Sequence, residues 1–254
     1  MLRLGILILS VTMPASISVR DFLDNSVVHV WKASLVADEQ AVAEYRANLC
    51  PEERERAERY VFPEHRRRFI VGRGLLRTLL GRYLGVSPAG VSFIYAKFGR
   101  PFLANGDIQF NVSHSGDIAL YGFVRNAEIG IDVECLRPIG IMEIARRFFS
   151  SSECESLATV PEPLREAAFY RCWTRKEAYL KARGFGLQTP LHSFTVSLDA
   201  DRPALLFVDN DPKAPHRWSF ANIDTGANAI GVVVFSGAAR RIVERAISAG
   251  HPGV

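Results

Sequence analysis

Several signatures that identify common protein classes are absent from this chain. Its four cysteines form no CxxC pair and show no zinc-binding spacing. The sequence also lacks a Walker-type glycine loop, a GxGxxG segment after a strand, and a nucleophile elbow. Nothing therefore supports a disulfide framework, a P-loop or an α/β-hydrolase site. We expect four reduced thiols in a reducing compartment, at Cys50, Cys135, Cys154 and Cys172.

Long apolar runs are also scarce. Residues 4–11 resemble a short signal-peptide core after Arg3, with Ala15 and Ser16 as weak cleavage-site residues, but they are too few to span a bilayer as a helix. We favour two alternatives: a start codon assigned too early, with Met13 available, or a plain apolar extension. No other segment approaches transmembrane length, so we expect a cytoplasmic protein with no membrane partner.

Acidic residues are missing from one basic stretch of a chain whose net charge is only +4. Residues 66–82 contain six arginines and no Asp or Glu. Such a cluster favours an anionic partner, either nucleic acid or a phosphorylated small molecule. A solvated, salt-bridged helix face is the ordinary alternative.

The order of predicted elements indicates an α+β fold of two similar halves related by a pseudo-twofold, each a small antiparallel sheet packed with a long helix. The first half, 26–126, is expected to contain helices at 38–48, 51–60 and 64–83 and strands at 27–31, 91–95, 108–113 and 118–124. The second half, 127–240, is expected to contain helices at 141–149, 151–159 and 163–183 and strands at 128–134, 193–198, 204–208, 216–223 and 228–235. We expect an N-terminal extension at 1–25 and a basic C-terminal tail at 241–254.

The predicted strand at 128–134 carries two carboxylates on one face. Asp132 and Glu134 alternate with apolar residues, so they lie about 6–7 Å apart for a rise of ~3.3 Å per residue. Two like charges held this close favour a positive charge between them. A solvated strand face is the ordinary alternative, although the flanking hairpin and helices favour a central strand.

The predicted helix at 163–183 carries a third carboxylate. Glu177 and Lys181 are one turn apart at the edge of its apolar stripe, where a routine surface pair would contribute only ~0.3–0.5 kcal/mol. Lys176 projects from within the stripe, where an ammonium is unfavourable unless it meets an anion. Three acids beside a lysine indicate a hard divalent cation next to an anionic, phosphorylated substrate.

His114 lies at a predicted turn between Ser113 and Ser115. A lone histidine is more often a structural residue. Here hydroxyl and backbone donors surround the imidazole, which suits a phosphate oxygen. Arginines of the 66–82 cluster would add planar, multidentate anion contacts.

Three segments together resemble the signature blocks of the 4′-phosphopantetheinyl transferases: 111–115 (NVSHS), 130–134 (GIDVE) and 173–181 (WTRKEAYLK). The resemblance covers about residues 27–235 and is closest to the monomeric, double-length type that serves surfactin synthetase and similar enzymes. It implies two α+β halves with coenzyme A in the cleft between them. It also implies Mg²⁺-dependent transfer of the phosphopantetheine arm of coenzyme A to a serine of an apo acyl or peptidyl carrier protein, with release of adenosine 3′,5′-bisphosphate.

The resemblance also implies roles for individual residues. Asp132, Glu134 and Glu177 match metal-binding acids. His114 and Lys181 match residues that contact the pyrophosphate. The carrier serine would lose its proton to Glu177, to Glu153 (which matches a further acid near the metal) or to water on the metal.

Contacts to the nucleotide end, particularly its 3′-phosphate, are matched by Arg56, Arg68, Arg100 and Ser113. Arg56 and Arg100 replace lysines of the closest relatives and keep the charge. Glu53 stands where those relatives carry a lysine, so a positive charge is lost there. This loss predicts either weaker binding of the 3′-phosphate or compensation by Arg54 or Arg67. After the acidic strand, the carrier protein is expected to dock on Ile139, Ile141 and Ile144.

Two rival functions make different predictions. A non-catalytic binder of coenzyme A or nucleotide would keep the fold without turnover, but the intact acids and Lys181 argue against it. A basic nucleic-acid-binding domain would use the arginine cluster, and its salt-sensitive binding would survive Glu177→Ala.

Overall fold

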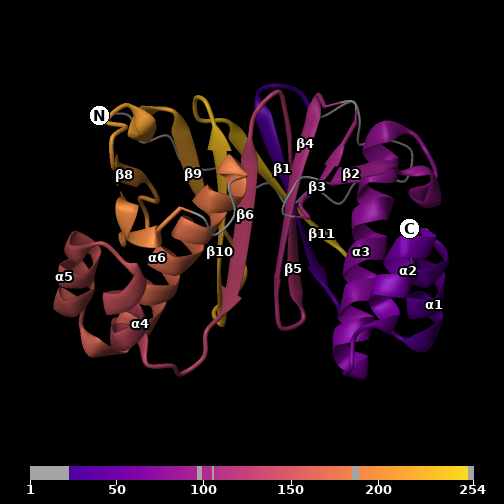
Figure 1. Cartoon of the computed structure of the whole chain (residues 1–254), viewed down its shortest axis with the longest axis horizontal. Coiled ribbons are helices and arrows are strands. Elements are labelled where there is room, and N and C mark those ends of the chain that lie inside the picture. The colour runs from indigo at the N-terminus through magenta and orange to yellow at the C-terminus, as the bar shows by residue number, and fades with distance from the viewer. Residues whose placement is uncertain (1–22, 96–98, 105, 185–188, 251–254) are drawn as a thin grey trace.

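The structure is a computed structural model that describes residues 23–95, 99–104, 106–184 and 189–250. Two central sheets face each other, and helices cover the outer side of each sheet (Figure 1). The signal-peptide-like residues 4–11, and the predicted N-terminal extension up to residue 22, lie outside the described residues.

The two halves follow one another along the chain. The elements of the first half are β1 Val27–Ser34, α1 Glu39–Ala47, α2 Pro51–Glu58, α3 Pro63–Leu84, β2 Phe93–Tyr95, β3 Pro101–Leu103, β4 Ile108–Ser115 and β5 Ile118–Arg125. Those of the second are β6 Ile129–Cys135, α4 Ile141–Phe148, α5 Ser151–Thr159, α6 Glu162–Arg183, β7 Phe194–Val196, β8 Leu205–Val208, β9 Trp218–Ile223 and β10 Ala229–Ser236. A last strand, β11, spans Arg241–Ile247.

The sheets are small and mostly antiparallel. One has the strand order β11-β1-β5-β4, the other β6-β10-β9, and two further pairs are β2-β3 and β7-β8. One apolar cluster fills the space between α3 and the first sheet, another lies around α6, and a third lies between the two sheets. The predicted α+β class with two similar halves is confirmed.

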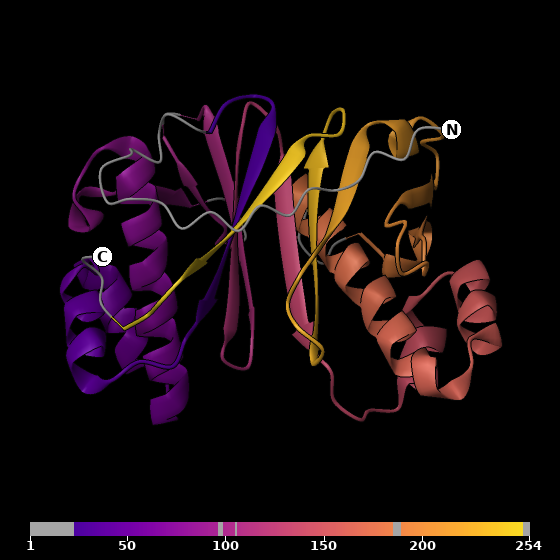
Figure 2. The ribbon, with the colours of Figure 1, turned by 180° about the vertical axis from the view of Figure 1, so that it is seen from behind.

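The segment predicted as a basic tail is instead a strand of the first sheet. β11 pairs in parallel with β1, from Val27 opposite Arg241 to Ala33 opposite Ile247. Figure 2 shows this yellow strand crossing from the second half to the indigo and magenta elements of the first. Its apolar residues explain the difference, because Val243 and Ile247 pack on the first-half core while Glu244 between them is exposed.

Helix α6 packs unusually close to β6. A Cβ atom at Gly130 would lie 2.0 Å from the Ala178 carbonyl oxygen and 2.4 Å from the Ala182 nitrogen. Only glycine permits that approach. It brings the polar edge of α6 over the face of β6 that carries the two carboxylates. Within the described ranges, no helix is long and apolar enough to cross a membrane.

Candidate active site

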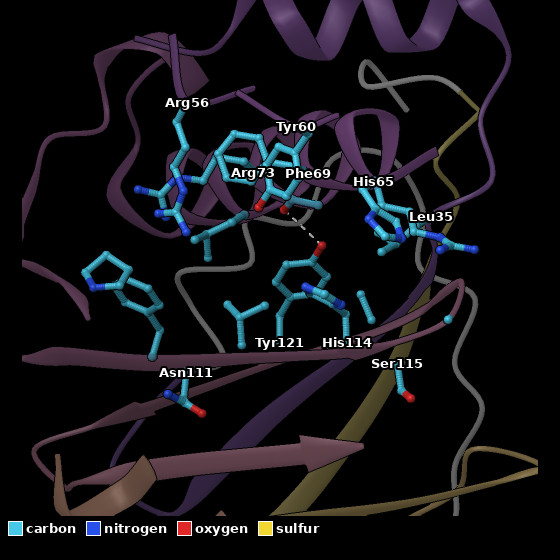
Figure 3. A pocket seen from close by; sticks show the side chains of 18 of the residues that line it. Leu35, Arg56, Tyr60, His65, Phe69, Arg73, Asn111, His114, Ser115 and Tyr121 are labelled. Carbon is cyan, nitrogen blue, oxygen red and sulfur yellow. Dashed lines mark hydrogen bonds between the residues drawn. The ribbon is translucent and has the colours of Figure 1, made fainter. Parts of the chain in front are cut away.

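A cavity of ≈ 620 Å³ opens in the first half, between α2, α3 and β4. Its wall is both basic and aromatic, including Arg56, Tyr60, His65, Arg68, Phe69, Arg73, His114 and Tyr121. Figure 3 shows His114 and Tyr121 pointing from the strands into this space, with Arg56, Tyr60 and Phe69 opposite them. Such a lining suits a ligand with an aromatic ring and anionic groups.

Two arginines named from the sequence border this cavity. The Arg56 guanidinium lies 5.2 Å from the centroid of the Phe69 ring. Arg68 donates to Asp117 Oδ1 at 2.8 Å, and this bond raises the pKa of Arg68. Both side chains border the cavity, and their predicted contact with a nucleotide remains a prediction.

Arg73 borders the cavity as well, although the sequence did not single it out as a site residue. Its Nε donates to Glu53 Oε1 at 2.5 Å, its Nη2 donates to Tyr95 OH at 2.6 Å, and its guanidinium lies 4.1 Å from the Phe93 ring centroid. These contacts hold its positive charge at the cavity rim. Arg73 was visible as part of the basic cluster, but its partners lie too far along the chain for the sequence to pair them.

Glu53 is not among the residues that line the cavity. Its carboxylate is buried, accepts from Arg73 and Arg77, and accepts the Cys50 backbone N–H at 3.1 Å. Arg54, predicted as a compensating cation, donates to two backbone carbonyls at the end of α1. The negative charge at position 53 is thus neutralised inside the first half.

His114 lines the cavity near two positive charges. Desolvation at the cavity wall lowers its pKa, and the nearby charges of Lys181 and Arg68 lower it further. The ring is therefore uncharged near neutral pH, and the positive charges of Arg68 and Lys181 are close enough to act on it.

Asp132 lies at the junction of the halves, where it contacts Ser113 of β4. It is 3% exposed, and its Oδ1 accepts from Ser113 Oγ at 2.8 Å and from Lys181 Nζ at 2.6 Å. Burial raises its pKa, while the Lys181 ammonium opposes that rise. Its other oxygen, Oδ2, is buried and has no hydrogen-bond partner.

The other two acids lie near Asp132. Burial raises the pKa of Glu134, and the charge of Asp132 raises it further. Burial also raises the pKa of Glu177, to which Asp132 and Glu134 both add. The charges of the three acids therefore act on one another, and their predicted role as ligands of one metal ion remains a prediction.

This carboxylate set fits a hard divalent cation by its chemistry. Oxygen ligands suit Mg²⁺, and the orphaned Asp132 Oδ2 is a buried acceptor in need of a positive partner. In the described part of the chain, no group of three acidic, His or Cys side chains stands in an arrangement that could hold a metal ion. In the arrangement shown, the Lys181 ammonium balances the Asp132 charge.

Ser113 does not line the cavity. Its side chain points to the opposite side of β4, where it meets Asp132 and Lys181. Ser115 borders the cavity, but its hydroxyl donates to Glu134. Because alternate residues of a strand face opposite ways, the two hydroxyls lie away from His114 and do not form the phosphate cradle that the sequence suggested.

The side chain of Arg100 also makes its hydrogen bonds outside the cavity. Its guanidinium donates to the Lys181 carbonyl at 2.5 Å and the Ile129 carbonyl at 3.1 Å. A first-half arginine thus ties the end of α6 to the start of β6. Its predicted contact with a 3′-phosphate remains a prediction.

Glu153 has a different set of partners from the other three acids. It is buried, accepts from Lys176 Nζ at 2.8 Å, and accepts the backbone N–H groups of Ser150 and Val196. The anion that Lys176 was expected to meet is therefore Glu153. Both carboxylate oxygens already have partners, so the geometry lends no support to its predicted role in proton transfer.

Comparison with known proteins identifies related sequences over most of the chain. Residues 128–233 match the model of the 4′-phosphopantetheinyl transferase superfamily, and residues 31–122 match that of the 4′-phosphopantetheinyl transferase N-terminal region. The 4′-phosphopantetheinyl transferase HetI of a Nostoc species is 40% identical over 215 residues, covering 83% of this chain and 88% of HetI. Sfp of Bacillus subtilis is 35% identical over 154 residues, or 60% of this chain and 68% of Sfp. The crystal structure of holo-[acyl-carrier-protein] synthase from Thermotoga maritima overlaps 43% of this chain and 62% of its own, with a TM-score of 0.35 and 22% identity, too slight a likeness to carry an argument.

Proposed function

This chain belongs to the 4′-phosphopantetheinyl transferase superfamily, and from that premise we propose that it transfers the 4′-phosphopantetheine arm of coenzyme A to a serine hydroxyl of an apo acyl or peptidyl carrier protein. The second product is adenosine 3′,5′-bisphosphate. The observation that carries the proposal is that Lys181 and Asp132 meet Ser113 on one face of β4, while His114 on the other face of that strand lines the basic, aromatic cavity. The positive charge of Lys181, which could bind a diphosphate, thus lies near a cavity whose lining could bind a nucleotide.

Coenzyme A would lie with its nucleotide end in the cavity and its diphosphate toward the acids. Arg56, Arg68 and Phe69 would receive the nucleotide end, through charge and ring stacking. His114 and Lys181 would contact the diphosphate, since the Lys181 charge already reaches the His114 ring. Arg73 would add a positive charge at the rim.

In the reaction, the carrier serine oxygen forms a bond to the β-phosphorus of coenzyme A. The bond from that phosphorus to the bridging oxygen breaks, and adenosine 3′,5′-bisphosphate leaves with the electron pair. Lys181 stabilises the charge that develops on the departing phosphate. Glu177 is the proposed acceptor of the serine proton.

Magnesium is the proposed cofactor, held by Asp132, Glu134 and Glu177. When bound, Mg²⁺ supplies positive charge to the diphosphate oxygens. The support for this assignment is the orphaned Asp132 oxygen and the mutual repulsion of the three carboxylates.

The carrier protein is proposed to dock after the acidic strand. A small cavity of ≈ 150 Å³ lies there between Glu134, Ile139, Ile144 and Trp173, and Ile139 is 36% exposed. An apolar side chain of the carrier would fit beside an acid of the site. Changing Ile139 and Ile144 to aspartate should raise the Michaelis constant for the carrier without changing that for coenzyme A. An unchanged Michaelis constant for the carrier would refute this surface.

The chain is proposed to act alone. Side chains from both halves of one chain, such as Ser113 and Asp132, already meet at the site.

The four cysteines are free, which agrees with the expected reducing cytoplasm.

The test is direct transfer. The full chain is incubated with coenzyme A, Mg²⁺ and a purified apo carrier protein, and the carrier is weighed by mass spectrometry. We expect the carrier to gain the mass of the arm while adenosine 3′,5′-bisphosphate appears. Coenzyme A binding without a mass gain would indicate a non-catalytic binder, and salt-sensitive nucleic-acid binding that survives Glu177→Ala would indicate the basic-domain rival.

A further inference from the structure

The outer edge of β6 is covered by side chains and not by another strand. β6 pairs with β10 on one side, and the two sheets meet where β6 lies against β4. Edge-strand N–H groups that are buried need acceptors. Alternate residues of β4 supply them: Asn111 Oδ1 accepts from Ile131 N at 2.9 Å, Ser113 Oγ from Val133 N at 3.4 Å, and Ser115 Oγ from Cys135 N at 3.1 Å. We call these three contacts the side-chain ladder.

The two serines of the side-chain ladder make a second contact that Asn111 does not make. Ser113 Oγ donates to Asp132 Oδ1 at 2.8 Å, and Ser115 Oγ donates to Glu134 Oε2 at 3.0 Å. A hydroxyl has one proton to donate. Because the backbone N–H already occupies an acceptor position, that proton is directed to the carboxylate. Each serine therefore fixes an acid against the strand that bears it.

This arrangement decides which oxygen of Asp132 remains available. Ser113 and Lys181 both engage Oδ1, so Oδ2 is left buried and without a partner. His114 lies between the two serines and points the opposite way, into the cavity (Figure 3). One strand thus holds the acids on one face and presents the imidazole on the other.

We propose that Ser113 and Ser115, which lie in the first half of the chain, are positioning residues that act through Asp132 and Glu134 of the second half. Their hydroxyls orient these two carboxylates for binding a divalent cation. The role of Ser113 is then to orient an acid, and it differs from the nucleotide contact that the family resemblance implies. Ser115 gains a role that the sequence did not suggest. The turnover part of this inference rests on the proposed function, whereas the metal-binding part does not.

The experiment measures Mn²⁺ binding to the full chain by electron paramagnetic resonance, with and without coenzyme A, for the unchanged chain, Ser113→Ala, Ser115→Ala and Asn111→Ala. Asn111→Ala is the matched control, because it removes a ladder acceptor on the same strand but no bond to a carboxylate. Asn111 also borders the cavity, so it is compared through Mn²⁺ binding and thermal unfolding only. Each serine variant should bind Mn²⁺ about tenfold or more weakly, as for other residues that orient metal ligands. Asn111→Ala should keep the affinity of the unchanged chain.

The kinetics of the transfer reaction provide a second test of the positioning role. Ser115→Ala should lower kcat about tenfold with little change in the Michaelis constant for coenzyme A, and Ser115→Thr, which keeps the hydroxyl, should restore it. Equal Mn²⁺ affinity in all four proteins, or no Mn²⁺ binding by the unchanged chain, would overturn the inference. An equal loss in Asn111→Ala would also overturn it, since the ladder would then be merely structural. If transfer fails with the unchanged chain while Mn²⁺ affinities differ as expected, the proposed function is wrong and the positioning role stands.

Discussion

The long helices of the two halves, α3 and α6, have two structural features in common, a closing glycine and a buried ion pair, which we call the frame. Each has 22 residues and ends at a glycine in the left-handed region, Gly85 at φ 70° and Gly184 at φ 71°. Eight residues before that glycine each carries a buried cation, Arg77 or Lys176. Arg77 pairs with Glu53 and Lys176 with Glu153. Each glutamate also accepts the backbone N–H of the residue that caps the start of its own helix, Cys50 for α2 and Ser150 for α5.

The same helices differ at the positions that face the junction. Seven residues before the closing glycine, α3 carries Thr78, which donates to its own helix at Gly74, whereas α6 carries Glu177. β1 has no carboxylate, whereas β6 has Asp132 and Glu134. The buried ion pairs are therefore common to both halves, whereas the three candidate site carboxylates lie in the second half only. The first half instead contributes the cavity.

The largest expected effect comes from removing the acid that distinguishes α6 from α3. Glu177→Ala should lower transfer about 10³-fold, because it removes both a proposed cation ligand and the proton acceptor. The protein should remain folded, since this side chain is only half-buried. Thr78→Ser, at the corresponding position of α3, should retain transfer. Comparable losses in both variants, measured by carrier mass, would break the distinction.

The buried ion pairs should respond alike in both halves. Glu153→Gln leaves Lys176 without a counter-charge and should lower the free energy of unfolding by about 3–5 kcal/mol, and Glu53→Gln should destabilise in the same way. Both are measured by denaturant unfolding. At a temperature where Glu153→Gln is folded, kcat should stay near that of the unchanged chain. A collapse of kcat without unfolding would instead favour Glu153 as a proton acceptor.

A smaller effect is expected where the frame of the second half is tightest. Gly130→Ala would press a methyl group against the α6 backbone and should lower the free energy of unfolding by about 3 kcal/mol, the upper range for overpacking. It should also lower transfer, because Glu177 and Lys181 move with α6. Gly106→Ala is the control, since its Cβ would meet only the end of Gln109 at 3.5 Å. Equal midpoints for the two variants in thermal unfolding would contradict the close packing.

The smallest effect concerns the link between the halves. The pKa of His114 lies below its ordinary 6.5, so the ring gains a proton only as the pH falls below that value. The added positive charge should strengthen binding of the diphosphate, and the Michaelis constant for coenzyme A should fall severalfold through this range. His114→Gln should remove that part of the pH dependence. Parallel profiles for the two proteins would place the diphosphate away from His114.

Most of the frame could be predicted from local patterns. Apolar alternation predicted β6 and the shared face of Asp132 and Glu134, and the apolar stripe of α6 predicted that Lys176 needs an anion. These features depend only on residues that are close together in the sequence, so each can be predicted from a single segment. The identity of the anion as Glu153 depends on packing between two helices, which no local pattern specifies.

The features that escaped prediction all join distant segments. β11 pairs with β1 across nearly the whole chain, and its half-exposed pattern reads as a tail when taken alone. The roles of Ser113 and Arg100 depend on which face of each segment meets the other half. A trace of the side-chain ladder was visible, because small polar residues recur at every second position from 111 to 115, but their partners in β6 were not.

The most direct measurement is a crystal structure of the full chain with coenzyme A and Mn²⁺, in which anomalous scattering locates the metal. The account predicts one Mn²⁺ bound by Asp132 Oδ2, Glu134 and Glu177 next to the diphosphate, with the nucleotide end in the cavity against Arg56 and Phe69. Coenzyme A bound outside that cavity, or Mn²⁺ bound away from these three acids, would contradict it.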